Sequence, residues 1–447
     1  MTEEKIYNKI TDGVIWKEVL LFFFPLVIGA FFQHLYTLVD TMIVGKALGT
    51  TELSAVGGSA AKFITLYLNF FIGVSSGITA YASRYLGEKN YPKLTNIIFN
   101  GTMFFVVFGT ILSVLGIVFS PQYFDLMNTP TESIALATTY LHTYLYGMVF
   151  AVLYNTFAGI MRGLGDSKKP LYALFFCSIC NIVLDVIFVF PLQMGVFGIA
   201  LATVISQGIS AVILGYMLFQ IVRHLDKSKP YIDITMIKDI AKIGIPAGCQ
   251  SIMYSLSNMA VQSGVNGFSD RSVAAWVTFV KLSSIPDIFL SSLGSTVMPF
   301  VGQNLGAKKI ERVTQSLNQI IAISFAILSV LVALFLWQGE FFLGLFTYDQ
   351  EVIAIGMDIM WVVMPMHILA VPQQMYSQAL RSLGQSFIPM IMTLVGVVGL
   401  RLAWVTFILP IAPNLQVLGA CYPASALLMS VVFAVYYRIE FKKITLQ

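Results

Sequence analysis

Residues 22–45 of the chain read FFFPLVIGAFFQHLYTLVDTMIVG, an almost unbroken apolar run. A helix needs about 20 apolar residues to cross the hydrocarbon core of a bilayer, so this run predicts a membrane span. One carboxylate, Asp40, lies near its end. An ionisable side chain within a span costs about 2.5–3.5 kcal/mol on insertion scales and by default marks a functional site. The alternative is that Asp40 sits at the helix end and is solvated by headgroup water.

The composition of the whole chain indicates a multi-pass membrane protein. Hydrophobic residues make up 57% and charged residues 11%, against roughly 25% charged in soluble domains. The first run is too long for a signal peptide and no cleavage site follows it, so we expect it to remain a span. The apolar runs predict twelve helical spans, near residues 16–45, 54–82, 95–119, 133–160, 171–190, 196–222, 243–266, 273–301, 314–338, 352–380, 387–409 and 416–438.

The basic residues predict the orientation of these spans. If both termini and the even-numbered loops share one side, that side holds 21 of the 26 Lys and Arg residues, Lys5 and Lys227 among them, and three more lie within spans. The other side holds only Lys46 and Arg271. The positive-inside rule then places both termini in the cytoplasm of a cell whose plasma membrane the protein spans. Because the basic charge is explained by topology, we expect no nucleic-acid partner.

The two halves of the chain repeat each other at an offset of 219 to 221 residues. Pro25 has its counterpart in Pro246, and the stretch 161–170 matches 380–389 at Arg, Leu, Gly, Ser and Pro. Six spans in each half predict a parallel repeat, as in transporters built from two bundles around a central cleft. We therefore expect an all-α membrane protein with an N-terminal six-helix bundle at 1–222, a cytoplasmic linker at 223–242 and a C-terminal six-helix bundle at 243–447. Within span two, Gly73 and Gly77 form a small-xxx-small face that favours close helix packing.

Polar side chains gather at one depth of the first bundle. Asn181 and Asp185 are four residues apart on one helix face, and Thr203 follows in span six. At 1.5 Å per residue, Asp40 and Asp185 lie roughly 7–8 Å below their outer helix ends, with Asn181 and Thr203 about 12–13 Å deep. If the carboxylates approach each other, one should retain a proton, which would make a site that exchanges protons or holds a monovalent cation. The alternative is simple hydrogen bonding between helices.

These residues carry a resemblance to the multidrug and toxic compound extrusion (MATE) family, prokaryotic branch. It covers nearly the whole chain through the span-one motif Pro25…Val39-Asp40-Thr41, the Gly-Glu/Ala-Lys loops after spans two and eight, and the Arg-x-x-Gly-x-Ser…Pro loops after spans four and ten. The resemblance implies that Asp40, Asn181, Asp185 and Thr203 form the proton or sodium coupling site. One branch of the family has acids in spans seven and ten, where this chain has glutamines and Asn258, with Asp358 only near the outer end of span ten. The resemblance therefore implies coupling through the first bundle, and the sequence leaves open whether the second bundle contributes.

The spans also contain candidates for substrate contact and for a hinge. These candidates are Tyr36, Lys62, Gln250, Asn258 and Lys281 for the substrate and Pro25 for the hinge. Lys62 and Lys281 occupy equivalent repeat positions, and the alternative for both is that they extend to the membrane interface. Proline kinks a membrane helix because it lacks the N–H of a helical hydrogen bond. Arg401 in span eleven has no evident partner, although an ion pair with Asp287 is conceivable from the sequence.

The predicted function is that of a secondary active antiporter. It would export hydrophobic, often cationic compounds in exchange for protons or sodium by alternating access. The rival within the superfamily is a flippase for lipid-linked sugars or an exporter of another metabolite. We expect no enzyme, because no nucleotide-binding loop, zincin motif or serine elbow is present. We also expect no cofactor apart from the coupling ion, a working monomer, and the lipid bilayer and small molecules as partners.

Overall fold

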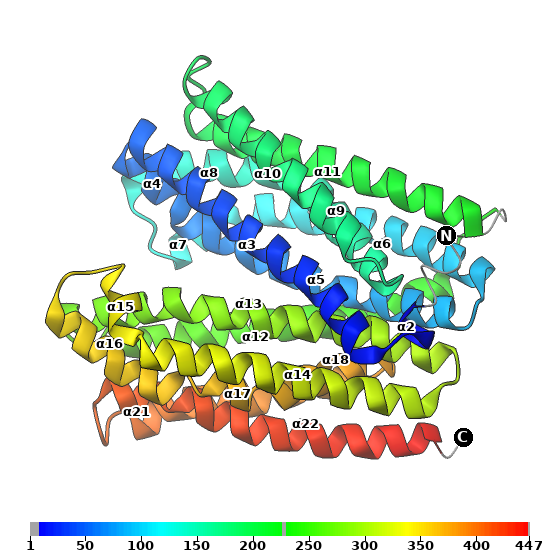
Figure 1. The fold of residues 1–447 in the computed structure, drawn as a ribbon. Coiled ribbons are helices and arrows are strands. Elements are labelled where there is room, and N and C mark those ends of the chain that lie inside the picture. The colour runs from blue at the N-terminus through cyan, green and yellow to red at the C-terminus, as the bar shows by residue number, and fades with distance from the viewer. Residues whose placement is uncertain (1–8, 226–228, 446–447) are drawn as a thin grey trace. The chain divides into compact units, whose positions relative to one another are not determined.

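The computed structural model describes residues 9–225 and 229–445, so Lys5 and Lys227 lie outside the described residues. Within these ranges every regular element is helical (Figure 1). The first half contains α2 (Lys9–Asp12), α3 (Ile15–Ala47), α4 (Thr50–Gly57), α5 (Ser59–Gly87), α6 (Tyr91–Val118), α7 (Ser120–Leu126), α8 (Thr131–Tyr146), α9 (Met148–Gly163), α10 (Lys168–Val189) and α11 (Gly195–Leu225). The second half contains α12 (Ile234–Val265), α13 (Asp270–Gly306), α14 (Ile310–Trp337), α15 (Gly339–Gly344), α16 (Gln350–Val363), α17 (Met366–Leu369), α18 (Val371–Ser382), α19 (Phe387–Thr393), the π-helix η1 (Leu394–Gly399), α20 (Leu400–Ala403), the π-helix η2 (Trp404–Ile408), α21 (Leu415–Gly419) and α22 (Cys421–Thr445).

The helices coincide with the expected spans. In the described part of the chain, ten helical stretches are long and apolar enough to cross a membrane, and α8 with α9 makes an eleventh. The remaining expected span, 243–266, lies in α12, which is 32 residues long but carries Gln250, Asn258 and Gln262. Its polar side chains make this helix less apolar than the others, although its length is sufficient to cross a membrane.

The expected span 133–160 is not one straight helix. It divides into α8 and α9, which are bent by 50° at Gly147. A Cβ atom at this glycine would lie 2.2 Å from a methyl carbon of Val204 on α11. Only glycine therefore allows α11 to approach the bend so closely.

By internal contacts, the chain divides into two compact units. One comprises residues 24–244, and the other comprises residues 1–23 together with 245–447. The boundaries fall inside two helices, between Phe23 and Phe24 in α3 and between Gly244 and Ile245 in α12. Each boundary is followed within two residues by a proline, Pro25 or Pro246. The first turns of α3 and of α12 are thus grouped with the opposite half of the chain. The expected linker 223–242 is also partly helical, because α11 extends into its start and α12 begins before its end.

The unit of residues 24–244 is built around α9, which packs against α5, α6 and α11, while α10 runs along α11 (Figure 1). Close packing of α5 against the start of α12 depends on glycine. A Cβ atom at Gly77 would lie 2.4 Å from the carbonyl oxygen of Ile240, and Gly244 approaches Val74 in the same way. The predicted small-residue face of span two is confirmed at Gly77, because two helix backbones meet there.

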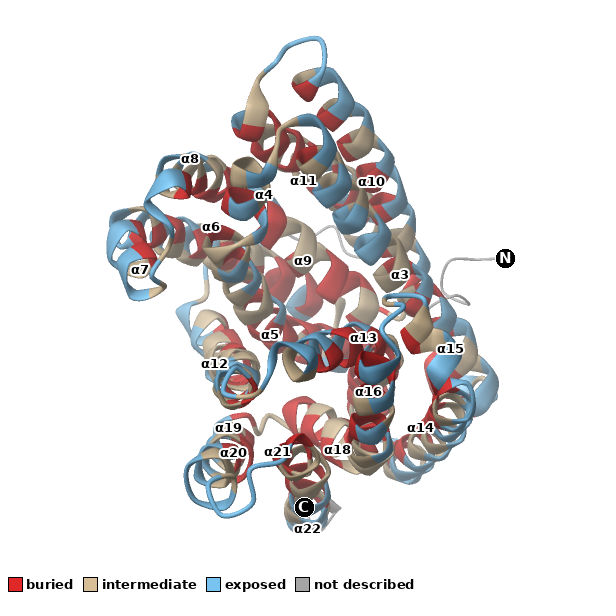
Figure 2. Ribbon diagram, turned by 90° about the vertical axis from the view of Figure 1, so that its left-hand side faces the viewer, coloured by how far each residue is buried: buried red, intermediate tan, exposed pale blue. Residues whose placement is uncertain are grey.

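In the other unit, α13 runs beside α14 and α18 beside α22. Trp276 and Phe279 lie in a buried apolar cluster of this unit. The start of α3 joins this unit through aromatic contacts: the ring centroids of Phe22 and Phe300 are 6.1 Å apart, and those of Phe23 and Phe289 are 6.0 Å apart. Figure 2 shows that individual helices carry buried residues on one side and exposed residues on another. Many exposed residues are large and apolar, as expected of faces in contact with lipid.

Short segments before the two leading helices dock in equivalent ways. The ammonium of Lys309 lies 2.5 Å from Asp12 Oδ1, and Arg312 donates to the carbonyl of Ile10 at 3.1 Å. The hydrogen bond from Lys309 lowers the pKa of Asp12, which lies outside the membrane-spanning helices. In the other unit, Asn96 and Asn100 hold the segment before α12 through hydrogen bonds to Tyr231 and Asp233. Each segment is therefore held by polar contacts to the unit that contains its helix start.

Candidate functional site

Two carboxyl groups meet inside the unit of residues 24–244. Asp40 comes from α3 and Asp185 from α10, and the two carboxyl groups lie close enough to interact electrostatically. Asp185 is 0% exposed, and Asp40 is half-buried. Asp40 Oδ1 and both Asp185 oxygens are buried and form no hydrogen bond with any group of the described chain. The structure therefore places the two acids together, as their similar depth in the sequence predicts.

The proximity of the Asp40 and Asp185 carboxyl groups has a chemical consequence. Two ionised carboxylates have only acceptor oxygens and repel each other, so they cannot hydrogen-bond. A single proton between them supplies an O–H donor and removes one buried charge. A small cation could instead lie between the oxygens, because carboxylate and carbonyl oxygens are the ligands that hard cations prefer. By its chemistry, the pair can take up and release one positive charge.

Asn181 and Thr203 complete the predicted set. Asn181 lies one helical turn before Asp185 and is 1% exposed. Its Nδ2 donates to Thr203 Oγ1 at 3.4 Å, and this hydroxyl donates to the carbonyl of Ile199 at 3.1 Å. The Oδ1 atom of Asn181 is buried and accepts no hydrogen bond from the described chain. All four predicted coupling residues therefore lie on three helices of one unit, with several acceptor oxygens left without donors.

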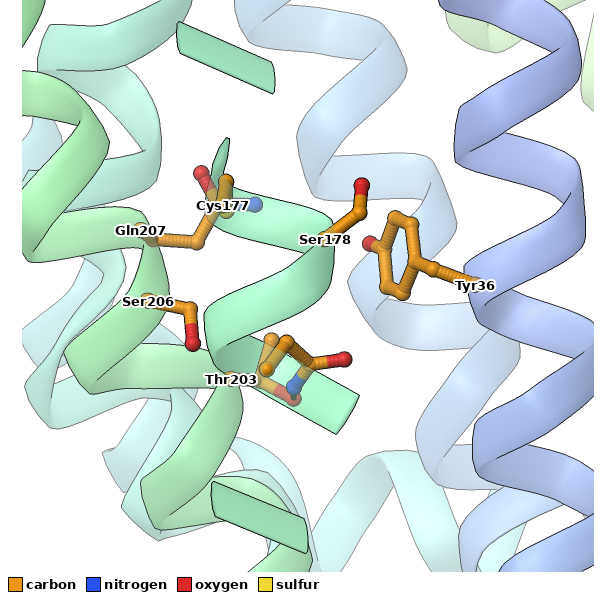
Figure 3. Close-up of a pocket in the computed structure, with 7 residues that line it drawn as sticks. Tyr36, Cys177, Ser178, Thr203, Ser206 and Gln207 are labelled. Atoms are coloured by element: carbon orange, nitrogen blue, oxygen red, sulfur yellow. Dashed lines mark hydrogen bonds between the residues drawn. The ribbon is translucent and has the colours of Figure 1, made fainter. Parts of the chain in front are cut away.

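A small pocket opens beside these residues (Figure 3). It is lined by Tyr36, Cys177, Ser178, Asn181, Thr203, Ser206 and Gln207. In Figure 3, Tyr36 reaches from α3 toward Ser178 on α10. Residues of α3, α10 and α11 therefore line this pocket, and the hydrogen-bonded pair Asn181 and Thr203 is among them.

An apolar cluster covers the site one helical turn away. Val44 follows Asp40 by four residues, and Val189 follows Asp185 by four. Both pack in one buried cluster with Ile199, which precedes Thr203 by four. Their exposed fractions are 5% or less. This cluster excludes water from one end of the site and explains why three polar residues from different helices converge there.

Sequence reasoning missed two tyrosines of α8. Tyr140 and Tyr144 lie within electrostatic range of Asp40, and Tyr144 is buried. Tyr36 from α3 is in the same group. The spacing of four between Tyr140 and Tyr144 places both on one helix face, which was the available signal. The sequence does not show that the chain bends at Gly147 between α8 and α9. Only the structure therefore shows which groups this face of α8 approaches.

The other unit uses its polar residues differently. Gln250 is 1% exposed, and both polar atoms of its amide form hydrogen bonds. Its Nε2 donates to Thr393 Oγ1 at 2.7 Å, and its Oε1 accepts from Arg381 at 2.6 Å. Asn258 is exposed and accepts from Arg401 at 2.9 Å. The conceivable Arg401–Asp287 ion pair is not formed among the described residues, and Asp287 instead lies 3.2 Å from His367 Nε2.

The remaining candidates lie apart from the carboxyl pair. Lys62 and Lys281 are both exposed, and the Lys281 ammonium lies 6.0 Å from the ring centroid of Phe346. Pro25 lies within the continuous helix α3, next to the boundary between the two units. Cys177 is a free, buried thiol, and the described chain contains no group of three or more His, Cys, Asp or Glu residues suited to a metal ion.

Long apolar helices arranged as a repeated pair of bundles, with a carboxyl pair enclosed in one of them, define a multi-pass membrane protein of the transporter class. The MatE family model matches residues 25–187 and again 246–405, and the chain belongs to this family. One match in each half also confirms the internal repeat.

Known proteins resemble the chain over most of its length. The probable multidrug resistance protein YoeA of Bacillus subtilis is 28% identical over 99% of this chain and 97% of its own length. The probable multidrug resistance protein YpnP of the same organism is 32% identical, with 68% of each chain covered. A crystal structure of a MATE protein in the bent conformation superposes with a TM-score of 0.89 at 20% identity, over 100% of this chain and 98% of that chain. This last similarity establishes the twelve-helix MATE fold.

Proposed function

We propose that the protein is a secondary active exporter of small hydrophobic, often cationic compounds, driven by the inward movement of protons or sodium. The observation that carries this proposal is the proximity of Asp40 and Asp185, two buried or half-buried acids with carboxyl oxygens that form no hydrogen bond in the described chain. Relatives that cover most of the chain are named as multidrug resistance proteins, which supports small-molecule export as the task.

The residues present fit a coupling ion of either kind. A proton would bridge the two carboxyl groups and neutralise one of them. Sodium would be held by oxygens of Asp40, Asp185 and Asn181, all of which include buried acceptors without donors. Thr203 offers a hydroxyl oxygen at the same level, although its proton is already donated to Ile199. Oxygen-only ligation suits a hard cation, so the ion itself has to be identified by experiment.

Helix α3 provides the physical link between this site and a conformational change. It carries Asp40 within the unit of residues 24–244, while its first turns up to Phe23 are grouped with the other unit. A change of charge at Asp40 alters how α3 binds α10 and α11. Pro25 lacks the N–H that would stiffen the helix at the boundary. We therefore assign Pro25 as the hinge through which loading of the carboxyl pair biases an alternating-access cycle.

The substrate candidates separate by burial. Tyr36 lines the pocket, and Asn258, Lys62 and Lys281 are exposed, so all four remain candidates for substrate contact. Gln250 is enclosed and bonded to Arg381 and Thr393, so we reassign it to the scaffold. We further propose that both termini face the cytoplasm of a plasma membrane and that the protein works as a monomer with an N-terminal and a C-terminal bundle.

The test is transport by the purified protein in liposomes. An imposed proton gradient and an imposed sodium gradient are applied separately, and movement of ethidium is followed by fluorescence. We expect one gradient to drive ethidium out against its concentration and Asp40→Asn to abolish this movement. Asp125→Asn, at an exposed position of α7, is the matched control. Wild-type transport by Asp40→Asn would overturn the proposal.

The rival function is translocation of lipid-linked sugars, and the buried cations Arg381 and Arg401 favour it. It predicts that neither gradient moves ethidium in these liposomes. It also predicts that a fluorescent lipid-linked sugar becomes accessible on the opposite leaflet. This outcome would replace the exporter proposal.

A further inference from the structure

Arg401 is a charged side chain inside the apolar part of the second half of the chain, and no role in the proposed function has been given to it. It is 7% exposed and lies on α20. This four-residue helix is flanked by π-helical segments on both sides, η1 and η2. A π-helical turn widens the backbone and displaces side chains from their usual positions, and such turns are frequent at functional sites.

The partners of Arg401 are all neutral. Its Nε donates to Ser425 at 3.3 Å, and its Nη1 donates to Ser257 at 3.4 Å and to Asn258 Oδ1 at 2.9 Å. The guanidinium carbon lies 4.1 Å from the ring centroid of Tyr422. In the described part of the chain no carboxylate forms an ion pair with Arg401, and Asp287 is paired with His367.

Two donors at this point remain available. None of the three hydrogen bonds of Arg401 uses Nη2. Asn258 accepts through Oδ1, from Arg401 and from the Tyr422 hydroxyl, which leaves the donor Nδ2 of its amide free. Asn258 is exposed, so this nitrogen lies at the rim. Because Arg401 Nη1 and Asn258 Oδ1 are bonded, the two free donors belong to adjacent groups.

We propose that Arg401, together with Asn258 and Tyr422, binds the anionic group of an amphipathic ligand. A carboxylate or phosphate has two oxygens that accept from two neighbouring donors, and guanidinium is suited to this geometry. A buried guanidinium without a carboxylate is costly in a membrane protein and usually marks a ligand path or a missing counter-charge. An anionic ligand group supplies that counter-charge, and the stacked Tyr422 ring holds the guanidinium in place for it.

The proposal extends the proposed function to ligands that carry an acidic group, including zwitterions. The proposal rests on that function only in assuming that the bound ligand is transported. Binding at Arg401 itself is measured without an ion gradient and does not require the carboxylate of Asp40. Two sources share the required chemistry, a transported amphiphile and the headgroup of an anionic lipid. The experiment has to distinguish these sources.

The experiment measures binding to full-length protein in nanodiscs of phosphatidylcholine. The probes are 1-pyrenebutyrate and its methyl ester, followed by pyrene anisotropy and by the tryptophan fluorescence of the protein, to which Trp404, three residues from Arg401, contributes. We expect the carboxylate to bind at least about tenfold more tightly than the ester. Arg401→Gln removes this preference, whereas Arg271→Gln, an exposed cation of the same unit, retains it. Asp40→Asn also retains it, which separates this test from that of ion coupling.

Each other outcome is informative. If phosphatidylglycerol added to the nanodiscs displaces pyrenebutyrate, the natural occupant is a lipid headgroup and the anion site stands. If Arg401→Gln does not fold, Asn258→Leu provides the second variant, because it removes the rim donor and leaves the bonds to Ser257 and Ser425 in place. Equal binding of acid and ester to the wild-type protein overturns the proposal, as does an unchanged preference in a folded Arg401→Gln protein.

Discussion

The fifth helix of each half shows how two copies of one structure have acquired opposite chemistry. Stretch 170–191 in the first half matches 389–410 in the second, with proline at both ends of each. The first copy is a regular α-helix that carries Asn181 and Asp185. The second copy contains two π-helical segments and carries Arg401 instead. Duplication therefore preserved the position and length of the helix, while the sign of the buried charge was free to change.

The leading helices differ in a second way. The start of α12 packs against α5 through Gly77 and Gly244, with backbones in close approach. The start of α3 packs through Phe22 and Phe23 against aromatic rings of α13. Glycine contacts require a short backbone separation and tolerate no added atom, whereas ring contacts can tilt and slide. We infer that the α3 contact is the more adaptable of the two, which agrees with assigning the hinge to Pro25.

The largest expected effect tests whether ion coupling belongs to the first half alone. Asp185→Asn should reduce gradient-driven ethidium transport to the level of protein-free liposomes, because a neutral amide cannot release a proton or balance a cation. Asp287 is an acid of the second half that is 58% exposed and lies beside His367. Asp287→Asn should retain transport. If the second variant loses transport and the first does not, the assignment of coupling is reversed.

The next effect concerns the glycine contact. Gly77→Ala places a carbon 2.4 Å from the Ile240 carbonyl oxygen and 3.0 Å from the Gly244 nitrogen, both backbone atoms that cannot rotate away. We expect a loss of about 3 kcal/mol in the free energy of unfolding, at the upper end of overpacking costs. Thermal unfolding in detergent measures it. Gly57→Ala, where no atom lies within 4 Å of the added carbon, is the control. Equal stability of the two variants would contradict the close contact.

A smaller effect tests the reassignment of Gln250. Gln250→Leu leaves a guanidinium nitrogen of Arg381 and the hydroxyl of Thr393 without their 2.6 Å and 2.7 Å partners. A loss of about 2 kcal/mol in the free energy of unfolding is expected, since buried groups lose their hydrogen bonds. Gln262→Leu, whose amide only reaches Asn266 at an exposed position, should change stability little. If Gln250→Leu is as stable as wild type but alters substrate affinity, Gln250 belongs with the substrate contacts.

The smallest effect is expected at the docked N-terminal segment. Asp12→Asn removes an exposed ion pair with Lys309, which should stabilise the fold by less than about 1 kcal/mol. Lys309 lowers the pKa of Asp12 from its ordinary value of 3.8, so this contribution is present above that value and is lost as the pH falls through the lowered pKa. The difference in thermal stability between wild type and variant should stay constant from about pH 8 to about pH 5 and shrink below about pH 3.8. A difference that grows on acidification would contradict the ion pair.

Much of the first-half site was predictable because it depends on local properties. Helix rise converts the spacing of Asp40, Asn181, Asp185 and Thr203 from their helix ends into a common depth, and the structure brings these four side chains together. The tyrosines of α8 were missed because their approach depends on the bend at Gly147. In the second half, the sequence does not show that Arg381 hydrogen-bonds the amide oxygen of Gln250, and this contact is the basis for proposing a scaffold role for Gln250.

The amino-acid sequence by itself determined the number of spans, their helical character and the internal repeat. These follow from the length and periodicity of apolar runs and from residue matches, which need no knowledge of neighbours in space. Only the tertiary structure decided which polar groups meet, where π-helical turns interrupt span eleven, and that the first turns of α3 and α12 are grouped with the opposite half. A polar side chain in an apolar interior forms hydrogen bonds with the groups that the packing of distant helices brings within about 3 Å. The local sequence does not specify which groups these are.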